Sequence, residues 1–166
     1  MKIGLVDTTF SRINMGKIAI DEINKINNQK IYPQVEYIRR TVPGIKDIAI
    51  ECQILFENEK CDIVLALGMV GGNEIDKMCA HEASLAIQQV KLKYSKHILE
   101  IFAHVTESLK NGKLDEKDFY SLTENRIRKH VQNAFLLLFD RQKLIDRAGK
   151  GIRQGREDEG EIKCGK

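Results

Sequence analysis

The chain has 166 residues, of which 42% are hydrophobic and 31% are charged, and these values are typical of one globular domain with its own core. No apolar run approaches the roughly 20 residues that span a bilayer, and the first residues lack a signal-peptide pattern, so we expect a cytoplasmic protein with no membrane partner. The net charge of +3 arises after residue 140, where acidic residues are interleaved and aromatic residues are absent, which disfavours a nucleic-acid partner.

Strand-like and amphipathic helical patterns alternate along the chain. The expected strands are residues 2–7, 35–41, 62–67 and 97–104. The expected helices are residues 15–27, 47–58, 75–94 and 115–139, with Asp47 as the N-cap of the second. This order predicts an α/β fold, a flavodoxin-like three-layer α/β/α arrangement around a four-stranded parallel sheet. We divide the chain into an α/β domain, residues 1–148, and a basic C-terminal tail, residues 149–166.

Three distinctive loops follow the first three expected strands, at residues 8–12, 42–47 and 68–73. Ligands of open parallel sheets bind at the carboxyl ends of the strands, so we expect all three loops at one ligand-binding edge. The third loop lacks the Gly-Lys-Ser/Thr ending of a P-loop. Its glycines either make a sharp turn or let the backbone approach a flat ligand closely.

Two residues of these loops have a structural and a functional interpretation. Phe10 lies in a polar loop, where it either covers the core or stacks on a ligand. Asp47 is most simply a helix N-cap, but its carboxylate can also accept hydrogen bonds from ligand hydroxyls. Neither choice is decided by the residues alone.

The cysteines do not suggest a metal centre. The chain has four, none of them in a Cys-x-x-Cys pair, so we expect reduced thiols. Cys79 and His81 are two positions apart, and on a helix this separates them by about 200° around the axis. Joint metal ligation is therefore disfavoured.

Five segments carry a family resemblance: VDTTFSR, TVPGIKD, ALGMVGG, DKMCAHEAS and AGKGIRQGREDEG. Together they resemble the archaeal-type riboflavin synthases of the lumazine synthase-like superfamily, in order along the whole chain. The resemblance implies a transferase of riboflavin biosynthesis that converts two molecules of 6,7-dimethyl-8-ribityllumazine into riboflavin and 5-amino-6-(ribitylamino)uracil. It also implies a homopentamer with active sites between subunits. The apolar run 134–139 is a second reason to expect contact with another subunit.

The resemblance assigns a substrate site to the three loops. Phe10 matches an aromatic residue that stacks on the heterocycle, and Asp47 matches a glutamate that holds ribityl hydroxyls. The predicted substrate-binding residues are Thr9, Phe10, Thr41, Val42, Pro43, Gly44, Asp47, Gly68, Met69 and Gly71. The dismutation needs no redox cofactor, because one substrate molecule reacts with another. We expect no cofactor; a divalent cation such as Mg²⁺ is compatible with the sequence but not indicated by it.

The general base is open. Ile75 stands where lumazine synthases carry their proton-transferring histidine, which argues against lumazine synthase activity. The candidate catalytic residues are Asp76, Lys77, His81 and His104. Each has a simpler alternative as a solvated, interface or strand-end residue. The alternative functions are a 6,7-dimethyl-8-ribityllumazine synthase and a flavodoxin-like module that binds a flavin without catalysis.

The tail has two interpretations as well. It is too polar to pack as a helix of its own, so one is a solvated, disordered end. The other is a segment that folds over a neighbouring subunit's site, where Lys150 or Arg153 pairs with a polar ring edge. The family resemblance extends into the tail and favours the second.

Overall fold

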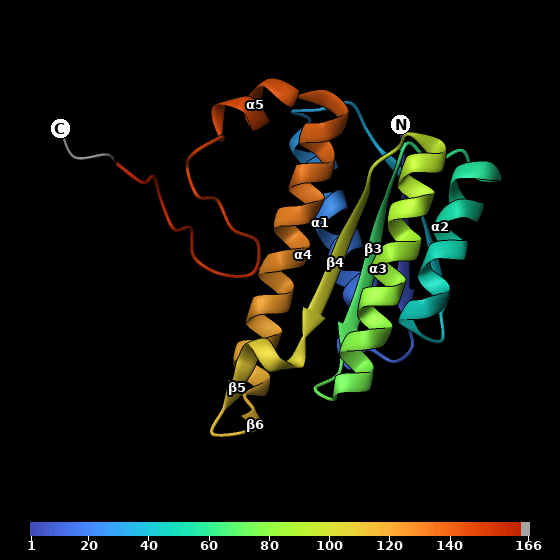
Figure 1. The fold of residues 1–166 in the computed structure, drawn as a ribbon. Helices are drawn as coiled ribbons and strands as arrows, with labels where there is room; N and C mark the ends of the chain where they lie inside the picture. Colours follow the sequence, from blue (N-terminus) through green and yellow to red (C-terminus); the bar gives the residue numbers. More distant parts are fainter. Residues whose placement is uncertain (164–166) are drawn as a thin grey trace.

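Every predicted strand and helix is present in the computed structural model, which describes residues 1–163. Four parallel strands form a sheet in the order β2-β1-β3-β4. The strands are β1 (Lys2–Thr8), β2 (Glu36–Val42), β3 (Ile63–Val70) and β4 (Ile98–His104). The main helices are α1 (Met15–Gln29), α2 (Ile48–Glu57), α3 (Glu74–Tyr94) and α4 (Glu116–Phe139). Helices α1 and α4 cover one face of the sheet and α2 and α3 the other (Figure 1), which confirms the flavodoxin-like three-layer prediction.

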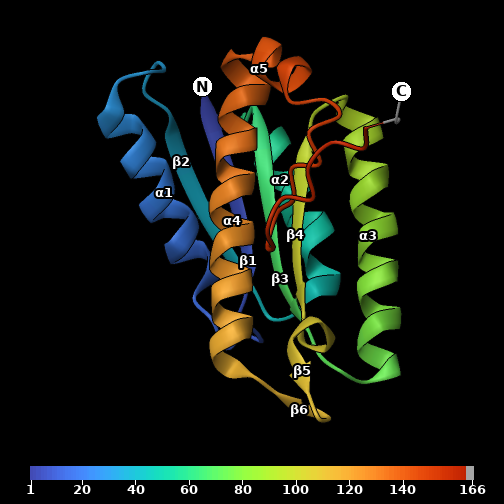
Figure 2. The same cartoon turned by 90° about the vertical axis from the view of Figure 1, so that its left-hand side faces the viewer.

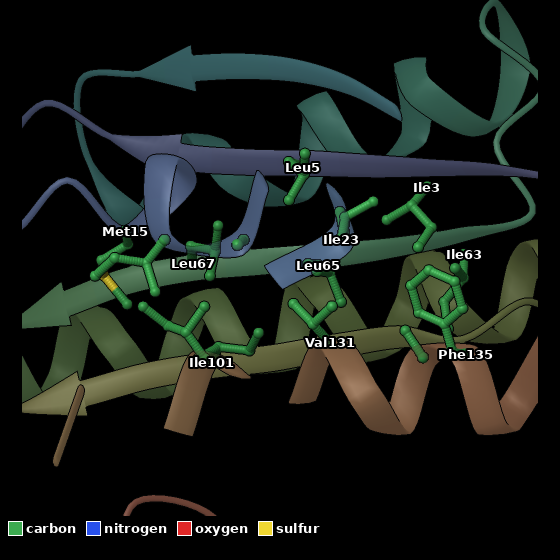
Figure 3. Packing of buried hydrophobic residues seen from close by; sticks show 14 of the residues in the cluster. Ile3, Leu5, Met15, Ile23, Ile63, Leu65, Leu67, Ile101, Val131 and Phe135 are labelled. Carbon is green, nitrogen blue, oxygen red and sulfur yellow. The ribbon is translucent and has the colours of Figure 1, made fainter. Parts of the chain in front are cut away.

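Alternation along the strands divides the core into two layers. Leu5 and Leu65 point toward α1 and α4, where they pack with Met15 and Phe135 (Figure 3). Their strand neighbours Val6 and Ala66 face α2 and α3. The central strand β3 is buried at all eight positions, as a continuous apolar run in a parallel sheet predicts.

Strand β3 is longer than its sequence pattern indicated. Gly68 and Met69 were expected in a loop, but they pair with Phe102 and Ala103 of β4 in regular register. The loop therefore contains only Gly71, Gly72 and Asn73. A Cβ added to Gly68 would lie 2.9 Å from the Phe102 ring, so this glycine allows close packing inside the sheet layer rather than a turn.

The prediction that Asp47 caps α2 with its side chain is wrong. A 3₁₀ turn, η1 (Ile45–Asp47), precedes the helix, and Asp47 already has helical backbone angles of φ −88° and ψ −8°. A capping side chain needs an extended backbone at this position, and the described Asp47 carboxylate makes no cap hydrogen bond. The Asp47 side chain is exposed instead.

Four further short elements were not anticipated. A 3₁₀ turn, η2 (Val105–Ser108), and a hairpin of β5 (Leu109–Lys110) and β6 (Lys113–Leu114) connect β4 to α4. Helix α5 (Arg141–Asp146) follows α4. The β5–β6 hairpin lies near the carboxyl edge of the sheet and α5 at the opposite edge (Figure 1). No helix within residues 1–163 is long and apolar enough to cross a membrane.

The apolar run 134–139 is covered by its own chain. Phe135 and Leu136 are buried, and the Tyr32 ring packs against both Phe135 and Phe139. The run therefore serves the subunit's own core, and its composition does not require a second subunit.

The described part of the tail, residues 149–163, is bound to its own subunit. It runs beside α4 and in front of β4 (Figure 2). Arg156 makes a two-pronged ion pair with Asp118 at 2.8 and 2.9 Å, and the Gly155 N–H donates to the Asn125 side chain at 2.9 Å. These contacts order the tail along α4. Residues 164–166, including Cys164, lie outside the described part of the chain.

Candidate active site

The loops after β1 and β2 are joined by two hydrogen bonds. The Thr9 N–H donates to the Val42 carbonyl at 2.9 Å, and the Thr9 hydroxyl donates to the Pro43 carbonyl at 3.2 Å. Because β1 lies between β2 and β3, the third loop ends at the same edge. The parallel topology therefore brings all three predicted loops together.

A cavity of about 290 Å³ opens where these loops meet, and we call it the Phe10 cavity. The residues that line it are Phe10, Pro43, Gly44, Ile45, Lys46, Met69, Val70, Gly71, Asp76 and Cys79. Mostly apolar walls with a few polar groups are typical of small-molecule sites. Phe10 is 55% exposed, so its ring does not cover the core and is free to stack on a planar ligand.

Half of the predicted substrate-binding residues line this cavity: Phe10, Pro43, Gly44, Met69 and Gly71. The other five lie around it in supporting positions. Thr9 joins the loops, the Thr41 hydroxyl donates to buried Asp7 at 2.7 Å, and Val42 is buried. Gly68 packs under the site, and Asp47 is exposed just beyond the lining residues. These ten assignments stay predictions.

Asp76 is the only one of the four predicted bases that lines the Phe10 cavity. Its carboxylate accepts a hydrogen bond from the Asn73 N–H at 3.0 Å, which satisfies one free donor at the start of α3. A Cβ added to Gly71 would lie 2.2 Å from the Asp76 carboxylate. Gly71 therefore makes room for this carboxylate at the cavity wall.

The other three predicted bases lie elsewhere in the described chain. Lys77 and His81 line a separate hollow of about 340 Å³ on the outer side of α3, where Lys77 pairs with Glu74 at 2.6 Å. His104 ends β4, and its backbone N–H donates to the Glu107 carboxylate at 3.0 Å. One subunit therefore does not bring the four residues together.

The sequence analysis missed four residues of the cavity wall as site residues, Ile45, Lys46, Val70 and Cys79, and two of them are ionisable. Cys79 is partly exposed in the wall, whereas Cys52 and Cys61 are buried. Helical spacing from Asp76 was the available signal, because positions three apart share a helix face. The second is Lys46, whose ammonium pairs with Glu82 of α3 at 2.6 Å. This contact raises the pKa of Lys46 and lowers the pKa of Glu82.

A larger cavity of about 470 Å³, the Arg12 cavity, lies on the α4 side of the same edge. Its lining residues are Arg12, Ile13, Met69, Leu114, Glu116, Lys117, Phe119 and Tyr120. An ion pair joins Arg12 to Glu116. Met69 lines both cavities, so the two are neighbours across one side chain. Among residues 1–163, no group of three or more His, Cys, Asp or Glu side chains is arranged to hold a metal ion.

The structure is that of an α/β protein with a cavity at the carboxyl edge of its parallel sheet, the edge at which such sheets bind ligands. The model of the 6,7-dimethyl-8-ribityllumazine synthase family matches residues 1–138, and the chain belongs to this family.

Relatives similar over the whole chain are named riboflavin synthase. The one from Methanothermobacter marburgensis is 45% identical over 98% of this chain and 99% of its own length, and the one from Archaeoglobus fulgidus is 46% identical with the same coverage. A 6,7-dimethyl-8-ribityllumazine synthase from Methanobrevibacter smithii is 37% identical over 35% of this chain and 44% of its own length.

Proposed function

We infer that this chain is a riboflavin synthase, an enzyme that transfers a four-carbon unit between two molecules of 6,7-dimethyl-8-ribityllumazine. The products are riboflavin and 5-amino-6-(ribitylamino)uracil. The observation that carries this conclusion is the similarity to riboflavin synthases from end to end of the chain. The similarity to a lumazine synthase covers 60 residues.

Position 75 supports the choice between the two reactions. The resemblance places the proton-transferring histidine of lumazine synthases at Ile75. This side chain is 62% exposed at the start of α3, and it is not among the residues that line the Phe10 cavity. An isoleucine has no group that can accept a proton, so the lumazine synthase reaction lacks its base here.

The Phe10 cavity suits the heterocycle of one lumazine. Stacking on Phe10 orients the ring, and the exposed Asp47 carboxylate lies at the rim, where it can accept hydrogen bonds from ribityl hydroxyls. The neighbouring Arg12 cavity offers space beyond Met69 for further substrate. Alignment of two reacting rings can supply up to about 7–11 kcal/mol of the barrier, and the chemistry requires no redox cofactor.

The proton-transfer role remains with the four candidates. Asp76 is the one at the cavity wall within a subunit. Lys77, His81 and His104 can serve only if a neighbouring subunit brings them to the site. This geometry makes Asp76 the first residue to test. A catalytic role of the other three depends on how the subunits assemble.

We propose that the protein assembles as a homopentamer. Ile75, Met78, Leu85 and Leu92 are between 53% and 80% exposed, and their spacing of three and seven residues places them on one side of α3. An apolar stripe of this length on a surface helix is typical of an interface. In a closed ring, the same stripe of each subunit is covered by its neighbours.

The tail and the cellular location belong to the same proposal. Arg156 binds Asp118 and the Glu107 carbonyl beside the β4–α4 connection, so the tail reaches the edge of the sheet where a neighbouring subunit would meet the site. We propose that it covers that neighbour's site. The free thiols of Cys52, Cys61 and Cys79 support a reducing, cytoplasmic location.

The deciding experiment is incubation of the purified protein with 6,7-dimethyl-8-ribityllumazine as sole substrate. We expect riboflavin and the aminouracil in equal amounts, one of each for two lumazines consumed, measured by chromatography. Parallel incubation of the aminouracil with a phosphorylated dihydroxybutanone should give no lumazine. Lumazine formation in the second reaction without riboflavin in the first would instead establish a lumazine synthase, and ligand binding without turnover would establish a flavin-binding module.

A further inference from the structure

Lys46 is the only lysine or arginine among the described residues that line the Phe10 cavity. It lies in η1, the 3₁₀ turn between the Pro43–Gly44 loop and α2. The preceding residue, Ile45, holds this turn against the sheet, since a Cβ added to Gly68 of β3 would lie 3.0 Å from the Ile45 side chain. A short turn packed on a central strand fixes where the Lys46 side chain begins.

The resting partner of Lys46 is easily exchanged. Its ammonium pairs with Glu82 at 2.6 Å, but the two side chains are 59% and 53% exposed. Exposed ion pairs of this kind contribute little, because water solvates both partners well. Lys46 can therefore leave Glu82 for an anionic group in the cavity at small cost.

The reaction proposed above creates such a group. The C–H bond of the lumazine C7 methyl breaks, the proton passes to the general base, for which Asp76 of the same cavity wall is the first candidate, and the electron pair spreads over the ring nitrogens and carbonyl oxygens. A cation fixed beside developing negative charge stabilises a transition state strongly. The other ionisable side chains of the cavity wall, Asp76 and Cys79, become negative when they ionise and cannot supply this stabilisation.

Resting on the proposed function, we propose that Lys46 contacts the lumazine bound against Phe10 and stabilises the anion formed at its C7 methyl. Before substrate arrives, the ammonium rests on Glu82. Lys46 is then a catalytic residue of the dismutation, distinct from the residue that removes the proton.

The test separates proton loss from product formation. Protein and lumazine are mixed in D₂O, and exchange of the C7 methyl protons is followed by NMR while riboflavin is quantified. In Lys46→Met we expect both rates to fall by about 10²-fold, the loss typical of removing one transition-state contact. Lys46→Arg, which keeps the charge, should recover most of both rates.

A matched control is available at the other end of α3. Lys93 forms a similar exposed pair with Glu57 at 3.4 Å, far along the helix from the cavity, so Lys93→Met should keep wild-type rates. Glu82→Gln removes the resting partner and should leave exchange at least as fast as in the wild type. The absorbance titration of bound lumazine should move to higher pH in Lys46→Met, because the anion loses its counter-charge.

The outcomes are distinguishable. If the wild type makes riboflavin and Lys46→Met, folded by circular dichroism, exchanges C7 protons at the wild-type rate, the role of Lys46 is overturned. An unshifted absorbance titration in Lys46→Met would overturn it equally. If the wild type itself makes no riboflavin, the proposed function fails, and this result is separate from any effect of Lys46.

Discussion

The two helix layers of the subunit differ in how their apolar side chains are covered. On the α1–α4 side, the Tyr32 ring packs against Phe139 at the end of α4, and the tail is hydrogen-bonded to Asn125 of the same helix. On the α2–α3 side, four large apolar side chains of α3 stay exposed, up to 80% for Leu92. The apolar end of α4 is therefore covered within the subunit, whereas the stripe of α3 is apolar surface that a further subunit can cover. The Phe10 cavity opens on this second side, between η1 and α3.

The largest expected effect comes from a charge in the exposed stripe. Leu85→Glu should dissociate the proposed ring and abolish most riboflavin formation, because a carboxylate buried between subunits has no counter-charge. Light scattering measures the mass of the assembly. Riboflavin formation measures the activity. Ile145→Glu is the matched control: Ile145 is 65% exposed on α5, on the other layer, and this variant should keep both. An unchanged mass in Leu85→Glu would break the comparison of the two layers.

The second effect concerns the packing of the α1–α4 side. Phe135 of α4 is 1% exposed and packs against Tyr32 and Phe139. Phe135→Ala should lower the free energy of unfolding by about 3–5 kcal/mol, because it removes buried apolar surface and leaves a cavity. Urea denaturation measures the change. The highly exposed Leu92 is the counterpart, and Leu92→Ala should cost the isolated subunit far less; equal losses would show that the two sides are packed alike.

The third effect is a pH dependence of the free energy of unfolding, and it comes from a histidine on the α1–α4 side. Burial, with a smaller contribution from Arg126, lowers the pKa of His130 on α4 to about 4. In the unfolded chain this histidine binds a proton below about pH 6.5, so stability is complete above that pH and falls as the pH drops toward 4. The difference amounts to about 3 kcal/mol. Denaturation of wild type and His130→Gln at several pH values tests this, because the variant should lose the histidine's share of the slope.

The smallest effect concerns the Phe10 cavity on the α2–α3 side. Phe10→Ala should weaken lumazine binding by about 1–3 kcal/mol, the range found for stacking of a base on an aromatic side chain. Fluorescence titration measures the affinity. Because Phe10 is 55% exposed, the free energy of unfolding should change little, which separates a binding role from a packing role. Unchanged affinity would remove the stacking role.

The hydrophobic pattern of the sequence predicted burial correctly wherever a single helical or strand period extended over a whole element. The burial of Ile18 and Ile23 in α1 and of Ile127 and Val131 in α4 followed the helical spacing of the sequence. The site was anticipated in part for the same reason. Phe10 and Pro43 follow strands, and parallel strands bring such positions to one edge whatever the details of packing.

These patterns did not predict the direction in which individual side chains point. Lys77 lies next to Asp76, yet it pairs with Glu74 outside the Phe10 cavity, because successive residues are rotated by about 100° around a helix. Asp47 does not cap α2 with its side chain because it is itself the last residue of the 3₁₀ turn Ile45–Asp47. One additional turn or one step around a helix decides such positions, and pattern matching is accurate only to within a few residues.

By itself, the sequence determined the order of strands and helices, the parallel sheet and the edge at which its loops meet, since each follows from local periodicity and from the short connections that such a chain allows. Only the tertiary structure decided that Lys46 and Cys79 share a wall with Phe10, that Arg156 of the tail pairs with Asp118 of α4, and that the stripe of α3 stays exposed. These are contacts between residues distant in sequence, and they depend on how whole helices pack and rotate against the sheet, which no single stretch of the chain encodes.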